Sequence, residues 1–210
     1  MKQVLLAEDQ QMVRQGLKMM IEETGEFRVI VEAATGQEAV EKGAEAAIDV
    51  AVLDIRMPEK SGLEACRELI RHQPELPVLM LTTFDDDAYA IEALESGAKA
   101  FMLKDADAAK LITAMKKAIE GGITIDEGTA GRIIPDLMKR EQPKPADVPL
   151  TKREKEITML VGDGRTNQEI ASELFLSVGT VKNHISVILD KLELRDRTQL
   201  AIYAIRHHLV

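Results

Sequence analysis

Five short apolar runs in the first half of the chain are each followed by an amphipathic stretch, and this alternation limits the possible folds. The runs are apolar throughout, which is typical of strands buried on both faces. The stretches repeat apolar residues at helical spacing. Together they predict a doubly wound α/β unit, with a parallel sheet covered on both faces by helices. The predicted strands are Gln3–Ala7, Arg28–Ala33, Val50–Asp54, Val78–Thr82 and Ala100–Leu103, and the predicted helices are Gln11–Glu23, Gln37–Ala47, Gly62–Arg71, Asp87–Ser96 and Ala108–Glu120.

Charge is distributed unevenly along the chain. Residues 1–140 carry a net charge of −9, whereas residues 151–210 carry +1. Between them, residues 141–149 contain three of the seven prolines and few apolar side chains, which favours extended backbone over packed structure. The sequence therefore predicts two units with different partners, joined by a linker. Residues 126–140 are predicted to form a connecting helix that Pro135 bends or breaks.

Other features exclude several classes of protein. The apolar runs are too short to span a bilayer, so we expect no membrane partner. Glu8 and Asp9 interrupt the N-terminal apolar run before a secretion signal could be completed. The single cysteine, Cys66, rules out an internal disulfide framework and fits a reducing cytoplasm. We therefore expect a cytoplasmic protein.

Carboxylates follow two of the predicted strands. Glu8 and Asp9 come directly after the first strand, and Asp54 ends the third. The carboxyl ends of parallel strands lie at one rim of the sheet, where ligands bind in such folds. A cluster of carboxylates there needs a cation, and hard oxygen ligands suit Mg²⁺. Thr82 and Lys104 join the same rim from the fourth and fifth strands, a combination that suits phosphoryl transfer to an aspartate.

These residues closely resemble a response-regulator receiver domain over about residues 1–122. The resemblance rests on Glu8-Asp9, Asp54 with Met57-Pro58, Gly62, Thr82 and Lys104. It implies that Asp54 is the phosphoacceptor and that Glu8, Asp9, Asp54 and the main-chain carbonyl of Arg56 hold Mg²⁺. It also implies that Lys104 pairs with the phosphoryl group and that the strand order is 2-1-3-4-5. A histidine kinase is the implied phosphodonor.

The resemblance further implies a switch formed by Thr82 and Phe101. On phosphorylation Thr82 would turn toward the phosphoryl oxygens, and Phe101 would move inward into the space that it leaves. Two positions depart from the family pattern. Phe101 lacks the hydroxyl of the tyrosine that is often found there, so only its steric role remains. Asp105 follows Lys104 where many receivers have proline, often with a cis peptide bond, and a cis bond before a residue other than proline costs about 3–4 kcal/mol.

The last 60 residues predict four short helices. Thr151-Lys152-Arg153-Glu154 and Thr166-Asn167-Gln168-Glu169 both have the form of a capping box, and each precedes an amphipathic run. Ser177 is predicted to be the N-cap of a third helix. The predicted helices cover Glu154–Val161, Gln168–Phe175, Val178–Leu192 and a segment around Leu200–Ile205. Two short helices in close succession form a helix-turn-helix pattern, whose second helix lies in the major groove of DNA.

This segment resembles the LuxR-type DNA-binding domain along nearly its whole length. The resemblance rests on Leu150-Thr151-Lys152-Arg153-Glu154, Asn167-Gln168-Glu169-Ile170-Ala171, Leu176 to His184, and Lys191-Leu192. It implies that Lys182, Asn183 and Ser186 face the groove. Lys and Asn side chains can bond to the edges of guanine and adenine. Thr180, Val181, His184, Lys191 and Arg197 are implied to contact the DNA backbone or to support the helix locally.

The sequence thus predicts a two-component transcriptional regulator that is not an enzyme acting on an external substrate. We expect a receiver (residues 1–122), a connecting segment (123–149) and a DNA-binding domain (150–210), acting on promoter DNA as a homodimer formed on phosphorylation. One alternative is a dimeric DNA-binding regulator that acts independently of phosphorylation. Others are a receiver acting only through protein contacts and an aspartyl-phosphate hydrolase, in which a second acid would usually occupy the position of Arg56.

Overall fold

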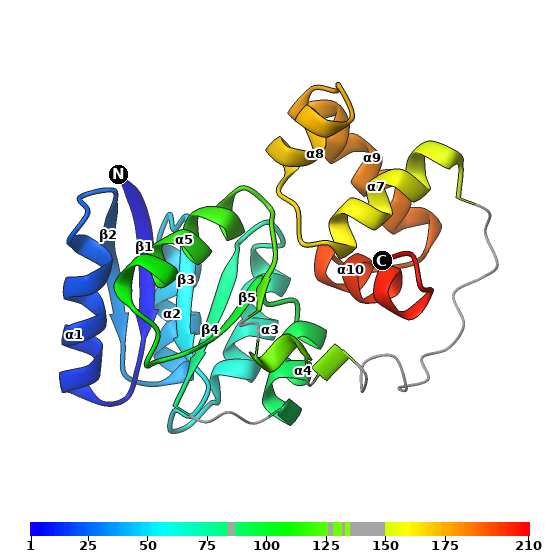
Figure 1. The fold of residues 1–210 in the computed structure, drawn as a ribbon. Helices are drawn as coiled ribbons and strands as arrows, with labels where there is room; N and C mark the ends of the chain where they lie inside the picture. Colours follow the sequence, from blue (N-terminus) through cyan, green and yellow to red (C-terminus); the bar gives the residue numbers. More distant parts are fainter. Residues whose placement is uncertain (84–86, 126–127, 132, 135–149) are drawn as a thin grey trace.

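The computed structural model describes residues 1–83, 87–125, 128–131, 133–134 and 150–210, and in them the chain forms an α/β unit and a helical unit (Figure 1). The α/β unit is built on a parallel sheet with the order β2-β1-β3-β4-β5-β6. The class and the order of the first five strands are as predicted, and the strand ends differ by no more than one residue. The strands are β1 (Lys2–Ala7), β2 (Phe27–Ala33), β3 (Val50–Asp54), β4 (Val78–Thr82), β5 (Ala100–Leu103) and β6 (Thr124–Ile125).

Helices cover both faces of the sheet. One face packs against α1 and α5, and the other against α2, α3 and α4. Because β3 and β4 are buried at every position, their continuous apolar sequence is explained by helices on both sides. The helices of this unit are α1 (Gln11–Glu22), α2 (Gly36–Glu45), α3 (Gly62–His72), α4 (Asp87–Glu95) and α5 (Ala108–Ile119).

The five-strand prediction is corrected by a short sixth strand. β6 pairs with β5 in parallel, through Ala100 with Thr124 and Phe101 with Ile125. It follows α5 after a turn at Gly121, which has a φ of 87°. Two residues are too few to produce a recognisable apolar run, so the sequence pattern does not reveal this strand.

Four helices form the second unit: α7 (Lys152–Gly162), α8 (Asn167–Glu173), α9 (Val178–Lys191) and α10 (Arg197–Arg206). Both predicted capping boxes are present, because Thr151 and Thr166 each exchange hydrogen bonds with the glutamate three residues later. Ser177 caps α9 by accepting a hydrogen bond from the Thr180 N–H. The local signals for three helix starts are therefore confirmed.

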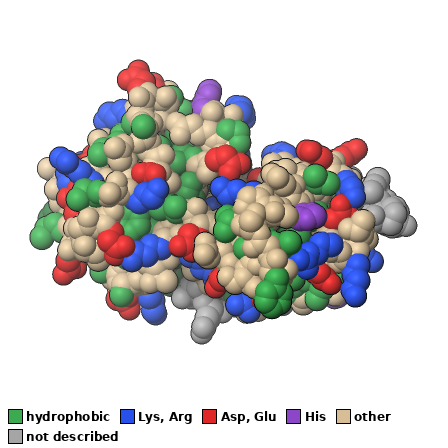
Figure 2. All heavy atoms as spheres, turned by 90° about the horizontal axis from the view of Figure 1, so that it is seen from above, with side chains coloured by type: hydrophobic (Ala, Val, Ile, Leu, Met, Phe, Trp, Pro, Cys, Tyr) green, Lys and Arg blue, Asp and Glu red, His purple; other side chains and the backbone are tan. Residues whose placement is uncertain are grey.

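The two units lie against each other beside α4 and the start of β5 (Figure 1). The Thr198 hydroxyl on α10 donates to the main-chain oxygen of Ala98 at 3.2 Å, and Arg195 donates to that of Glu95 at 3.1 Å. The Asn167 N–H, at the start of α8, donates to the carbonyl of Glu120 at 3.0 Å. In Figure 2 the two lobes lie side by side, with acidic and basic side chains interspersed over both.

The predicted connecting helix over residues 126–140 lies mostly outside the described residues. Helical backbone is described at 128–131 and 133–134. Within the described part of the chain, no helix is long and apolar enough to cross a membrane.

Gly62 and Gly16 provide a matched test of the packing beneath the rim. A Cβ on Gly62 would lie 1.9 Å from the Asp54 carbonyl oxygen, whereas a Cβ on Gly16, in α1, would meet no atom within 4 Å. We expect Gly62→Ala to destabilise the α/β unit by about 1–3 kcal/mol, because backbone must move. Gly16→Ala should stabilise it by roughly 0.5–1 kcal/mol through helix propensity. Urea unfolding followed by circular dichroism measures both, and equal effects would contradict the close approach.

Candidate functional site

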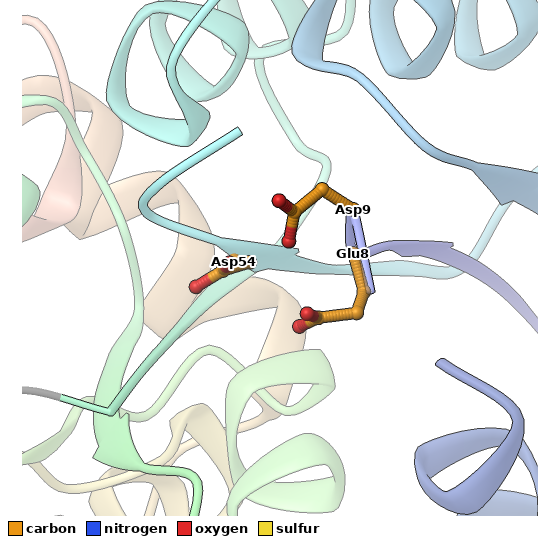
Figure 3. Close-up of side chains that lie close together, drawn as sticks. All are labelled: Glu8, Asp9 and Asp54. Atoms are coloured by element: carbon orange, nitrogen blue, oxygen red, sulfur yellow. The ribbon is translucent and has the colours of Figure 1, made fainter. Parts of the chain in front are cut away.

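Three carboxylates meet at the rim, as the sequence predicts from the ends of the strands. Glu8 and Asp9 follow β1 and Asp54 is the last residue of β3, which lies next to β1 in the sheet. One oxygen from each carboxylate lies within 4.8 Å of the others. Figure 3 shows the three side chains leaving the two strand ends and turning toward one space. Parallel pairing of β1 with β3 is what brings them together.

Lys104, directly after β5, neutralises part of this charge. Its Nζ lies 2.6 Å from Glu8 Oε2 and 3.0 Å from Asp54 Oδ1. The Lys104 side chain is only 8% exposed, and that of Glu8 is fully buried. The ion pairs are therefore largely shielded from water. Electrostatic interactions are stronger in such a buried site than at the surface.

The pKa values of the two buried carboxyls reflect opposing effects. Burial raises the pKa of Glu8 above its ordinary value, the charge of Asp54 raises it further, and the hydrogen bond from Lys104 lowers it. Burial likewise raises the pKa of Asp54, against a lowering by Lys104. The acid cluster is thus short of positive charge, as expected for a site that takes a cation.

The donor set fits a hard divalent cation. Glu8, Asp9 and Asp54 supply carboxylate oxygens, and Asp9 is exposed, so the site opens toward solvent on one side. A cleft of about 570 Å³ adjoins it, lined by residues that include Asp9, Arg56 and Tyr89. Open access and oxygen ligands match Mg²⁺, which keeps several waters and pairs with phosphate oxygens.

The predicted switch residues lie beside this site, with one difference from the expectation. Thr82 ends β4 and is buried, and its main-chain oxygen accepts from the Lys104 N–H at 2.8 Å. Phe101 on β5 is already fully buried, so its ring does not start from an outward position in this structure. No cis peptide occurs in the described residues, and the bond between Lys104 and Asp105 is therefore trans.

In the helical unit, the structure places the three residues expected to face the groove on the exposed side of α9. Lys182, Asn183 and Ser186 are all exposed, and Ser186 also bonds back to the Lys182 carbonyl at 3.2 Å. They are spaced so that one face of the helix presents an ammonium, an amide and a hydroxyl. Such a face can donate to and accept from base edges.

The other expected DNA residues fall into different settings. Val181 is fully buried in the core. Arg197 is 7% exposed, and its guanidinium donates to Asn167 Oδ1 at 2.8 Å and to the carbonyl of Arg165, while burial lowers its pKa to about 10. Both side chains therefore support the fold in this arrangement and do not reach outward.

Lys191, Thr180 and His184 are half-buried. Lys191 pairs with Glu154 of α7 at 2.5 Å, which ties the end of α9 to the first helix of the unit. The Thr180 hydroxyl shares a hydrogen bond of 2.8 Å with that of Ser177. These contacts of Lys191 and Thr180 stabilise the fold locally.

Comparison with known proteins agrees with this geometry. Residues 4–116 match the response regulator receiver domain, and residues 148–204 match the LuxR family of bacterial regulatory proteins. Together these matches span most of the chain. It belongs to the LuxR-type response regulators.

Relatives of this response regulator align over nearly its full length. It is 39% identical to the transcriptional regulatory protein LnrK of Bacillus subtilis, covering 99% of this chain and 98% of that protein. It is also 39% identical to LiaR of the same organism, with 100% of both chains covered. Among solved structures it is similar to the response regulator ChrA of a heme-sensing two-component system (33% identity, TM-score 0.54, 99% and 98% covered). The chain is thus a two-component response regulator with a receiver and a LuxR-type DNA-binding domain.

Sequence reasoning missed two groups of residues in this response regulator. The Arg56 guanidinium lies over the Tyr89 ring, 5.4 Å from its centroid, and borders the cleft beside Asp9. The contacts of Thr198 and Arg195 with the receiver were also not foreseen. Gly97, where an added Cβ would lie 3.2 Å from the Asp196 carboxylate, marks a close approach at that contact. A glycine alone does not indicate which segment approaches it.

Substitutions of Asp54 and of Lys104 should shift the pKa of Glu8 in opposite directions. Asp54→Asn removes a negative charge and should lower the pKa of Glu8, whereas Lys104→Met removes its hydrogen-bond donor and should raise it. The Glu8 carboxyl contributes stability at low pH that is lost as pH rises through its raised folded pKa. Lys104→Met should move this loss to higher pH. Carboxyl carbon NMR titration without divalent metal measures the shifts, and shifts of the same sign would contradict the coupling.

Proposed function

We propose that Asp54 accepts a phosphoryl group from a histidine kinase and that this controls dimerisation and DNA binding. The observation that carries the proposal is the rim itself, where one oxygen of each of three carboxylates lies within 4.8 Å of the others and Lys104 contacts two of them, Glu8 and Asp54. The proposed division of labour assigns residues 1–122 to phosphoryl transfer, 150–210 to DNA and 123–149 to their connection. We place this regulator in the cytoplasm, as an acceptor without turnover of an external substrate.

Each residue has a definite part in the transfer. An Asp54 Oδ attacks phosphorus, the phosphorus–nitrogen bond to the kinase histidine breaks, and the imidazole nitrogen that leaves takes a proton from solvent. Glu8, Asp9, Asp54 and the Arg56 carbonyl would hold Mg²⁺, which neutralises charge on the phosphoryl oxygens when bound. Lys104, now 3.0 Å from Asp54 Oδ1, would pair with one of those oxygens. The Thr82 hydroxyl would bond another.

Phosphorylation would act on the contact between the two units. Thr82 ends β4 and Phe101 lies in β5, which packs against α4, the receiver helix that α10 contacts. Movement of Thr82 toward a phosphoryl group would loosen the contact between α4 and α10 and free α10 together with the helix-turn-helix. Phe101 is already buried, so the proposed signal starts at Thr82 and the α4 side, and does not depend on a large swing of the ring.

DNA recognition is proposed for the exposed face of α9. With a net charge of +1 for residues 151–210, one copy can neutralise few phosphates, and single modules of this size bind weakly at physiological salt. A homodimer on two half-sites about one helical turn apart would supply the missing contacts.

The acceptor is tested by intact mass and sedimentation with Mg²⁺ and a small acyl phosphate. Wild type should gain one phosphoryl group and shift toward dimer, whereas Asp54→Asn should do neither. The matched control is Asp105→Asn, which alters a carboxyl next to Lys104 and should leave the gain intact. Uptake by Asp54→Asn at the wild-type rate would show that another residue is the acceptor. Dimer and DNA binding without uptake would favour the regulator that acts independently of phosphorylation.

The reading face is tested with DNA sites selected from a random pool. Lys182→Ala should weaken specific binding by about 1–3 kcal/mol and relax the preference at one base position, since it removes a base-edge donor. The control is Lys155→Ala, an exposed lysine on α7. It should leave the ratio of specific to scrambled binding unchanged. An unaltered ratio in Lys182→Ala would remove this residue from the reading set.

A further inference from the structure

A polar cluster lies between α1 and β2, away from the phosphoacceptor. Glu32 on β2 receives Lys18 Nζ at 2.7 Å and Gln15 Nε2 at 3.0 Å, both from α1. Arg14, which precedes Gln15 on the same helix, has its Nε 3.6 Å from the Glu32 carboxylate. Three polar side chains of α1 thus contact one carboxylate, and the proposed phosphoryl transfer uses none of them.

Arg14 extends this cluster to the rim. Its second contact is a hydrogen bond of 2.5 Å from Nη1 to the main-chain oxygen of Glu8. The Glu8 N–H in turn donates to the Ala33 carbonyl at 3.1 Å, at the end of β2. The peptide groups on both sides of Glu8 are therefore held by β2, one directly and one through Arg14 and Glu32. The Arg14 side chain is only 15% exposed, so water competes little for this contact.

We infer that Arg14 is a positioning residue for the magnesium-binding carboxylates, holding the turn that carries Glu8 and Asp9 in place from β2. The inference rests on the proposed function, because it needs Mg²⁺ to bind at the rim. Arg14 has the geometry for the role, since a guanidinium can donate to a carbonyl and pair with a carboxylate at once. Residues that orient metal ligands in this way change metal affinity by about 10–100-fold when removed.

The positive charge of Arg14 has an opposite effect, because a cation near the site repels Mg²⁺. Glu32 offsets that charge, and nearby Lys18 holds the pKa of the Glu32 carboxyl below its ordinary value, so it is ionised at neutral pH. The two effects predict opposite changes in Mg²⁺ affinity when Arg14 is substituted. Loss of positioning weakens Mg²⁺ binding, whereas loss of repulsion strengthens it.

The test is a titration of the full-length chain with MgCl₂ alone, followed through the amide NMR signals of residues 8–10 and 54. Arg14→Met keeps the length of the side chain without a donor and should raise the Kd for Mg²⁺ about tenfold. Glu32→Gln removes the carboxylate charge that pairs with Arg14 and should raise the Kd for Mg²⁺ by a smaller factor. Arg14→Lys keeps a charged donor and should stay within about threefold of wild type. Lys116→Met breaks a surface pair with Glu26, far from the rim in sequence, and should change nothing.

The outcomes separate the possible roles. An unchanged Kd for Mg²⁺ in Arg14→Met overturns the inference. A lower Kd also overturns it, because the repulsion between Arg14 and Mg²⁺ would then outweigh any positioning. Equal weakening in Arg14→Lys and Arg14→Met would assign the effect to side-chain packing and also overturn it. Thermal unfolding of each variant without metal checks that the receiver stays folded. If wild type itself binds no Mg²⁺, the metal site of the proposed function is wrong. If wild type binds Mg²⁺ and Arg14→Met has no effect, only the positioning role of Arg14 is wrong.

Discussion

The receiver depends on one ammonium placed between two buried carboxylates. Glu8 and Asp54 are nearly inaccessible to water, and two like charges at such a place oppose the folded state unless a cation accompanies them. Lys104 contacts both. Because burial still raises the pKa of each carboxyl, a single lysine offsets the cost only in part. The same imbalance that limits stability favours a divalent cation at this site.

Much of the receiver could be predicted from its sequence, because its signals are local. Continuous apolar runs give strands, helical spacing gives helices, and the rule that ligands bind at the carboxyl ends of parallel strands brings Glu8, Asp9 and Asp54 together. The capping boxes at Thr151 and Thr166 likewise mark helix starts through contacts within four residues. β6 could not be predicted in this way, because two residues are too few to show a periodic pattern of apolar side chains.

What could not be predicted depends on contacts between distant segments. A sequence pattern places Arg197 at the start of a helix, but only the folded helical unit brings its guanidinium to Asn167 Oδ1, at the start of α8. Phe101 could be assigned to a strand, whereas its complete burial depends on the layers around that strand. Arg14 lies on α1 and Glu32 near the end of β2, so their pairing follows from the packing of the helix on the strand and not from sequence spacing.

The contact between the two units has a consequence that follows from their being one chain. In the described part of the chain, the hydrogen bonds that join them include those of Thr198, Arg195 and Asn167. A tether makes association intramolecular, at an effective concentration that reaches millimolar for short flexible connections. A contact too weak to hold two separate proteins can therefore stay closed within this chain. Every 1.4 kcal/mol then changes the open-to-closed ratio about tenfold, so a small change in the free energy of this contact decides which arrangement the chain adopts.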